Sequence, residues 1–230
     1  MVLLGRLHNS QDLQRPQASH LAGLVSEEAR VHEIRTAEEL LQHYGEVSFR
    51  AARKVHAALD QHDRDFIAQS PFLVLATAGD LLDVSPRGDL PGFVQVLDDG
   101  RLLLPDRRGN NRVDSLLNVL QDPRVSLIFL IPGVGETLRV NGTAVISVDP
   151  ALRSRCAVEG SEPATVLVVT VEEALMQCPR ALKRSRLWDP ESWTEADLAS
   201  MDVVLADQIP ELTLEESLAL GAASGEKPLW

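Results

Sequence analysis

The segment LLPDRRGNNRVDSLLNVLQDPRVSLIFL, residues 103–130, decides the fold. Its pattern predicts the end of a strand, an arginine-rich turn, a short helix over 111–121 and a second strand over 124–131. The predicted helix carries apolar residues on one face, namely Val113, Leu116, Leu117 and Leu120. Pro123 ends it, because proline lacks a backbone donor and restricts the residue before it.

The turn of this segment concentrates positive charge in a chain whose formal net charge is −12. Three arginines lie within six residues: Arg107, Arg108 and Arg112. Asn110 or Asn111 is placed to cap the helix, and Asp114 stands in its first turn. A well-capped helix explains the asparagines and the aspartate but not the crowded arginines. Since like charges repel, and since a helix start offers free backbone N–H groups, the turn predicts a bound phosphate.

On either side of this segment the chain reads mainly as strands with short turns. We expect strands over 72–78, 82–85, 92–97, 101–104, 124–131, 137–148 and 165–171. We expect further helices over 36–44, 48–70, 179–187, 194–208 and 214–220. A parallel sheet would need a helix after nearly every strand. The order of elements therefore predicts a mainly β protein, an antiparallel barrel with helical additions.

Two local features refine this reading. Gly142, inside the predicted strand 137–148, indicates a bulge or a bend. In the long predicted helix 48–70, His62 shares the face of the periodic apolar residues. We therefore interpret His62 as a packed or half-exposed core histidine rather than a ligand.

Length and composition suit a main domain with extensions. We expect a poorly ordered or extended segment over 1–34, the barrel with its preceding helices over 35–193, and an acidic helical extension over 194–230. From residue 189 to the end there are ten acidic residues and one basic residue. This acidity argues against nucleic-acid binding. No apolar run reaches the roughly 20 residues of a membrane span, and two cysteines make no disulfide framework, so we expect a cytoplasmic protein.

Two further clusters stand out beside the turn. Ser85, Arg87 and Asp89 lie in the pentapeptide SPRGD; Arg87 suits a phosphate or a planar carbonyl, but an ordinary turn with an Arg87–Asp89 pair is also open. The basic run 180–188 ends in Trp188, which suits either a flat heterocycle or an interface. The sequence lacks a dinucleotide fingerprint, a Walker motif, metal-ligand spacing and a nucleophile elbow. An anion site without these suggests a cofactor that brings its own chemistry.

At these residues the chain resembles the pyridoxamine 5′-phosphate oxidase-like, FMN-binding split-barrel family, over roughly 48–193. The passages that carry the resemblance are SPRGD (85–89), GNNR (109–112), DPRVSL (122–127), ETLRVNG (136–142) and KRSRLW (183–188). More narrowly, the passages other than DPRVSL are similar to a bacterial subgroup of FMN-dependent enzymes of unassigned substrate.

The resemblance implies a six- to seven-stranded antiparallel Greek-key split barrel and a homodimer with FMN bound at the subunit interface. It places Arg87, Asp106, Arg107, Asn110, Asn111 and Arg112 around the phosphate and ribityl chain. Ser85 and Asp89 would approach the ring or the ribityl edge, and Thr137 lies on a strand that touches the flavin. The partner subunit, or the rim of the site, would supply Lys183, Arg184, Ser185 and Trp188.

The chain departs from the genuine oxidase, which carries an Arg-x-Val-Leu-Leu-Lys strand and a C-terminal Trp-Gly-Gly segment. Neither occurs here, so oxidation of pyridoxamine phosphate is not expected. The leading hypothesis is an FMN-dependent oxidoreductase that transfers hydride at the flavin N5 and acts on an unknown small substrate. Alternatives are a non-catalytic flavin-, haem- or F420-binding or sensor protein of the same fold, and a barrel that serves only as an interaction module.

Overall fold

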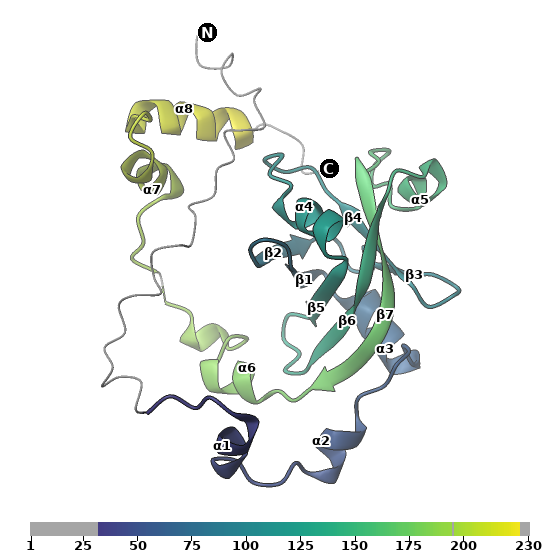
Figure 1. The fold of residues 1–230 in the computed structure, drawn as a ribbon. Coiled ribbons are helices and arrows are strands. Elements are labelled where there is room, and N and C mark those ends of the chain that lie inside the picture. The colour runs from purple at the N-terminus through teal and green to yellow at the C-terminus, as the bar shows by residue number, and fades with distance from the viewer. Residues whose placement is uncertain (1–31, 195, 226–230) are drawn as a thin grey trace. The chain divides into compact units, whose positions relative to one another are not determined.

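The computed structural model describes residues 32–194 and 196–225 (Figure 1). The prediction for 1–34 therefore falls almost entirely outside the described residues. Contacts divide the chain into two compact units, 1–48 and 49–230. In the first unit, α1 (Ala37–Gln42) begins with the capping box of Thr36 and Glu39, as the sequence predicts.

The second unit contains a seven-stranded, wholly antiparallel sheet that curls into a half-barrel (Figure 1). Its strands are β1 (Phe72–Thr77), β2 (Asp83–Gly88), β3 (Gln95–Val96), β4 (Leu102–Asp106), β5 (Arg124–Leu130), β6 (Thr137–Ser147) and β7 (Thr165–Gln177). The spatial order is β2-β1-β5-β6-β7-β4-β3. Because β4 lies beside β7 at the end of the β5–β6–β7 meander, the arrangement is a Greek key. The predicted fold class is confirmed.

Alternation of side chains places the core on the inner face of the curled sheet. In β5, for example, Val125, Leu127 and Phe129 are buried, whereas the residues between them are half-buried. Helix α4 (Asp114–Gln121) adds Leu116 and Val119 to the same core. The helix between the arginine turn and β5 is thus held by its apolar face, as the periodicity predicts.

The bulge expected at Gly142 is present, because the register between β6 and β7 shifts between Asn141 and Gly142. A Cβ atom on Gly142 would lie 2.0 Å from the carbonyl oxygen of Thr170. Glycine is therefore required here for the close approach of the two longest strands.

The predicted helix over 48–70 is wrong. The structure has two helices there, α2 (Phe49–Arg53) and α3 (Gln61–Gln69). Between them His56 exchanges backbone hydrogen bonds of 3.1 and 2.8 Å with Ala174 of β7, and a capping box at Asp60 starts the second helix. His62 is exposed on α3, so the prediction of a packed or half-exposed core histidine is also wrong.

Neither Asn110 nor Asn111 caps α4, so the cap expected from the sequence is wrong. Asn111 has a left-handed φ of 60°, a conformation that no α-helix contains. The helix therefore begins three residues later than expected, after Val113, and no side chain caps it.

The remaining helices follow the barrel or interrupt it. They are α5 (Pro150–Arg155), which the sequence reading missed, α6 (Arg180–Ser185), the 3₁₀ helix η3 (Pro190–Ser192), α7 (Met201–Gln208) and α8 (Leu214–Gly225). Helix α7 begins later than the predicted residue 194. Ser217 of α8 donates a hydrogen bond of 3.2 Å to Asp202 of α7. Within the described ranges, none of the helices combines the length and the hydropathy of a membrane span.

Candidate anion-binding site

A cavity of about 400 Å³ opens where β4 ends and β7 begins. Its walls are the arginine turn, the start of α4 and the segment 161–165, with Arg87 reaching in from β2. Six of the predicted cofactor residues line it: Arg87, Asp106, Arg107, Asn110, Asn111 and Arg112. The structure thus brings the two sequence clusters of arginines together.

Two ion pairs join the arginines near β2 and β4 at this cavity. Strands β2 and β4 are not neighbours in the sheet, yet Arg87 Nη1 lies 2.9 Å from Asp106 Oδ1. Residues 85–88 belong to β2 and not to a turn, so Ser85 and Arg87 share its half-buried face. Pro86 is tolerated because β2 is an edge strand of the described sheet.

Arg107 makes the second of these cross-connections. Its Nε lies 2.6 Å from Asp89 Oδ2, and its Nη1 donates to the carbonyl oxygen of Cys156 at 2.7 Å. The side chains of Arg107 and Asp89 are only 16% and 1% exposed. Asp89 therefore pairs with Arg107 and not with Arg87, and it lies outside the lining of the cavity.

The turn between β4 and α4 presents the other polar groups. Arg112 Nε donates to Asp114 Oδ2 at 2.6 Å, and this carboxylate raises the pKa of the Arg112 guanidinium above its ordinary value. The side chain of Asn110 accepts from the backbone N–H of Arg112 at 3.0 Å. Arg108 is exposed, and among the described residues no hydrogen bond or ion pair engages it.

Ion pairs offset most of the positive charge that the sequence places in this turn. Arg87, Arg107 and Arg112 each have a carboxylate of the same chain beside them. Crowding of these arginines therefore does not by itself require an outside anion. Within the described part of the chain, Arg108 is the arginine of this cavity whose charge is left without such a partner.

Two buried polar atoms at the cavity lack partners. Arg87 Nε and Thr165 Oγ1 are both buried without a hydrogen bond to any described residue, and both residues line the cavity. Buried polar groups in folded proteins nearly always have a partner, which is often water or a ligand. Helix α4 also starts there without a side-chain cap, and such a helix start attracts an anion. The residues present therefore fit a polar ligand that carries negative charge.

The other predicted site residues do not line this cavity. Ser85 is close, since its hydroxyl is 3.1 Å from that of Ser115, which Arg87 also contacts. Thr137 is buried at the start of β6 and donates to Gln177 at 3.2 Å. That contact marks the end of β7, and the cavity lies at the beginning of this 13-residue strand, about 40 Å away along an extended strand.

The basic group after β7 is at this far end as well (Figure 1). Lys183 and Trp188 line a separate cavity of about 300 Å³, and Trp188 Nε1 donates to the Val134 carbonyl at 2.9 Å. Ser185 donates to the Leu182 carbonyl at 3.1 Å, and Arg184 is exposed on α6. Within one chain, this group does not meet the arginine cavity.

Sequence reasoning missed the wall formed by 161–165 and the buried Ser115. Ser115 donates to Asp83 Oδ2 at 2.6 Å and so ties α4 to β2. The wall arises because Thr165 pairs with Asp106 in the β4–β7 register. No local sequence signal marks such a contact, since the two residues are far apart in the chain.

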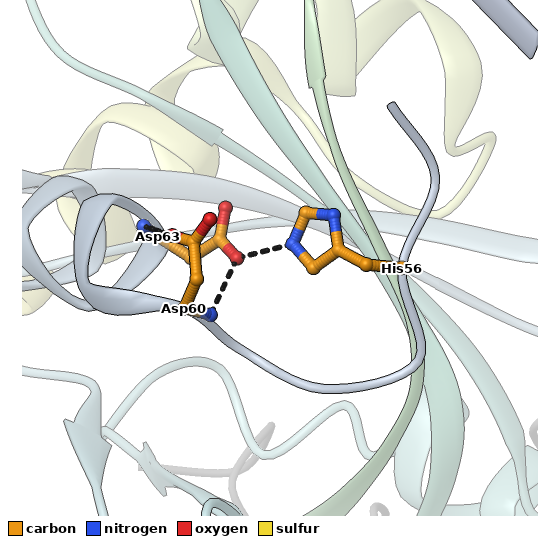
Figure 2. A group of neighbouring side chains, drawn as sticks. All are labelled: His56, Asp60 and Asp63. Atoms are coloured by element: carbon orange, nitrogen blue, oxygen red, sulfur yellow. Dashed lines mark hydrogen bonds and ion pairs between the residues drawn. The ribbon is translucent and has the colours of Figure 1, made fainter. Parts of the chain in front are cut away.

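A third group of polar side chains, His56, Asp60 and Asp63, lies within 4.8 Å of one another (Figure 2). The His56 ring points toward Asp63, with Nε2 2.6 Å from Oδ2, and its Nδ1 is 3.0 Å from the Lys54 carbonyl oxygen. Both ring nitrogens thus face acceptors, and the hydrogen bond to Asp63 raises the pKa of His56. The carboxylates of Asp60 and Asp63 cap α3. This group is therefore a helix cap joined to an ion pair. The atoms that could bind a metal already take part in the hydrogen bonds of the cap and of the ion pair.

Comparison with known proteins places these features in a family. A search of curated proteins returned no match. Among solved structures, the chain is similar to HupZ of Group A Streptococcus, with 16% identity over 52% of this chain and 94% of that chain, and a TM-score of 0.43. General stress protein 26 of Bacillus anthracis has 17% identity over 49% and 89% of the two chains (TM-score 0.36). A pyridoxamine 5′-phosphate oxidase-related, FMN binding protein of Nostoc punctiforme has 14% identity over 52% and 80% (TM-score 0.34).

The decisive comparison is with family models. The model described as pyridoxamine 5′-phosphate oxidase matches residues 59–178, just over half of the chain. The matched range runs from the residue before the α3 cap to the residue after β7, and so contains the whole sheet and the arginine turn. The chain belongs to the pyridoxamine 5′-phosphate oxidase family.

Proposed function

We propose that this protein binds FMN in the arginine cavity and acts as a cytoplasmic, homodimeric, FMN-dependent oxidoreductase on a small substrate. The observation that carries the proposal is the set of unsatisfied groups at one cavity. Arg108 has no partner among the described residues, Arg87 Nε and Thr165 Oγ1 are buried without one, and α4 starts uncapped. A phosphate with neighbouring hydroxyl groups would satisfy all four.

The cavity residues would divide the cofactor between them. Cationic side chains and the start of α4 suit the phosphate, because both place positive charge or N–H donors there. The ribityl hydroxyls both donate and accept hydrogen bonds, and so match Asp106, Asn110 and Thr165, which together offer acceptors and donors.

The chemistry would come from the cofactor, since bound FMN supplies hydride and electron transfer at its N5. Among the described residues, those that line the cavity include no histidine or cysteine. Its two carboxylates are paired, Asp106 with Arg87 at 2.9 Å and Glu162 with Arg153 at 3.5 Å. The protein's own contribution is therefore to bind and orient the cofactor, and not to act as a nucleophile.

A second copy of the chain would complete the site. Lys183, Arg184, Ser185 and Trp188 lie beyond the far end of β7 from the cavity. In the homodimer we propose, these residues reach the flavin bound by the partner. The assignment to the cytoplasm is supported by the two cysteines, Cys156 and Cys178, which are both free.

The main alternative is a non-catalytic flavin-binding protein, which the same cavity residues support equally well. A haem protein is less well supported, because in the part of the chain that the structure describes the lining residues contain none of the usual axial ligands His, Cys, Met or Tyr. The two flavin hypotheses differ only in turnover.

The test is an absorption spectrum of the purified protein and of its supernatant after heat denaturation. We expect flavin bands and release of a phosphorylated flavin. Turnover of NAD(P)H or of another small donor by this protein would support the oxidoreductase, and bound flavin without turnover would support the alternative. A colourless protein that does not bind added FMN would contradict the proposal.

A further inference from the structure

We propose that Arg108 gives the cavity its selectivity for phosphorylated over unphosphorylated flavin, and that Arg107, although it also lines the cavity, is a structural tether that contributes little to this selectivity. This inference rests on the proposed function. It reverses the division implied by the family resemblance, which places Arg107 but not Arg108 among the cofactor residues, although both belong to the arginine turn expected to bind phosphate.

The side chain of Arg107 holds two segments of the fold together. Its two hydrogen bonds join the residue after β2, Asp89, to the residue after α5, Cys156. The carboxylate of Asp89 is almost completely buried, at 1% exposure, and also accepts from the backbone N–H of Leu90 at 2.7 Å. Turning Arg107 toward a ligand would leave a buried carboxylate without its cation, which is strongly unfavourable.

Arg108 is in the opposite situation. It is exposed and has no hydrogen-bond or ion-pair partner in the described ranges. Like Arg107, it lines both the main cavity and an adjoining hollow of about 210 Å³, but its guanidinium is not held by a carboxylate among the described residues. Within the described ranges, no carboxylate lines that hollow, and a Cβ atom on the next residue, Gly109, would have no atom within 4 Å. A guanidinium in open space between two hollows can place its planar N–H fork on a phosphate.

The other arginines of the cavity cannot supply the same selectivity. Both terminal nitrogens of Arg87 are used, on Asp106 at 2.9 Å and on Ser115 at 3.2 Å. The charge of Arg112 is offset by Asp114 at 2.6 Å. These pairs are close to neutral, so they distinguish a phosphate from a hydroxyl poorly. Arg108 is the cation with net charge to offer.

Two adjacent substitutions test the division of roles in the full chain after flavin removal. The probes are FMN and riboflavin, titrated by quenching of flavin fluorescence, and thermal unfolding is recorded in parallel. We expect R108Q to weaken FMN binding by about tenfold or more, the range of a hydrogen bond to a charged group, and to leave riboflavin binding within about twofold. R108K should recover part of the selectivity. R107Q, the matched control, should lower the melting temperature and keep the ratio of FMN to riboflavin affinity.

The outcomes separate the inference from the proposed function. If the wild-type protein binds FMN and R108Q keeps the FMN-to-riboflavin ratio, the inference is wrong and the function stands. A loss of selectivity in R107Q or in the milder R107K, without one in R108Q, would restore the assignment made from the sequence. If the wild type binds neither flavin, the proposed function fails; inorganic phosphate then replaces FMN as the probe. Stabilisation by phosphate that R108Q abolishes would retain Arg108 as the anion-binding residue, and equal stabilisation of both proteins would exclude it.

Discussion

At the residue scale, an unpaired polar group at the cavity should affect ligand affinity and folding stability in opposite directions. The buried hydroxyl of Thr165 has no hydrogen-bond partner in the described part of the chain, and burying an unpaired hydroxyl costs about 1–3 kcal/mol. In the flavin-free protein, Thr165→Val should therefore leave the free energy of unfolding unchanged or raise it by about 1 kcal/mol. The same substitution should weaken FMN binding, because the ligand loses a donor. Chemical denaturation and flavin titration measure the two effects, with Thr165→Ser as the control that keeps the hydroxyl.

The ion pair of His56 and Asp63 gives a pH-dependent prediction at the same scale. The hydrogen bond to Asp63 raises the pKa of His56 above 6.5 in the folded protein, with a smaller contribution from Asp60. A raised folded pKa means that the pair stabilises fully below pH 6.5 and that this stability is lost as the pH rises through the folded pKa. His56→Gln should therefore destabilise the protein more at about pH 5 than at about pH 9. Denaturation at both pH values measures this, and the exposed His62→Gln should show no such difference.

At the scale of the element, the pairing of β6 with β7 depends on the bulge at Gly142. A Cβ atom there would collide with the Thr170 carbonyl at 2.0 Å, and a backbone atom inside a sheet cannot move aside. Gly142→Ala should lower the free energy of unfolding by about 2 kcal/mol or more, as overpacking does. Gly109→Ala is the matched control, since its Cβ would meet no atom within 4 Å. Equal stability of the two variants would show that the strands do not need the close approach.

Elements that depend on local pattern could be predicted, and those that depend on distant partners could not. The alternation in β5 and the apolar face of α4 depend on residues close together in the chain, so the sequence predicts both. The helix expected over 48–70 failed because its periodic residues belong to different segments, which the pairing of His56 with Ala174 separates. In the site, the sequence predicts the arginine turn. It does not predict that Asp89 pairs with Arg107 or that Thr165 lies opposite the turn, because these contacts form only when the sheet folds.

At the scale of the whole molecule, we expect a homodimer. Several large apolar side chains of the barrel are exposed in the single chain, among them Val84, Leu120 and Val145. In the homodimer we propose, those of them that form a continuous apolar surface would be buried against the partner. Light scattering should therefore give about twice the 25.2 kDa of one chain. A mass of one chain at micromolar concentration would contradict both the dimer and the shared flavin site.

A mixing experiment tests whether two chains build each site. If Arg108 of one chain and Trp188 of its partner serve the same flavin, R108Q and Trp188→Ala homodimers each carry one defect in both sites. After subunit exchange, a mixed dimer carries both defects in one site and none in the other. Random mixing should thus restore wild-type affinity at about one quarter of all sites. Sites built within a single chain would gain nothing from mixing, because every site would keep its own defect, and FMN titration of the mixture would then match the average of the two variants.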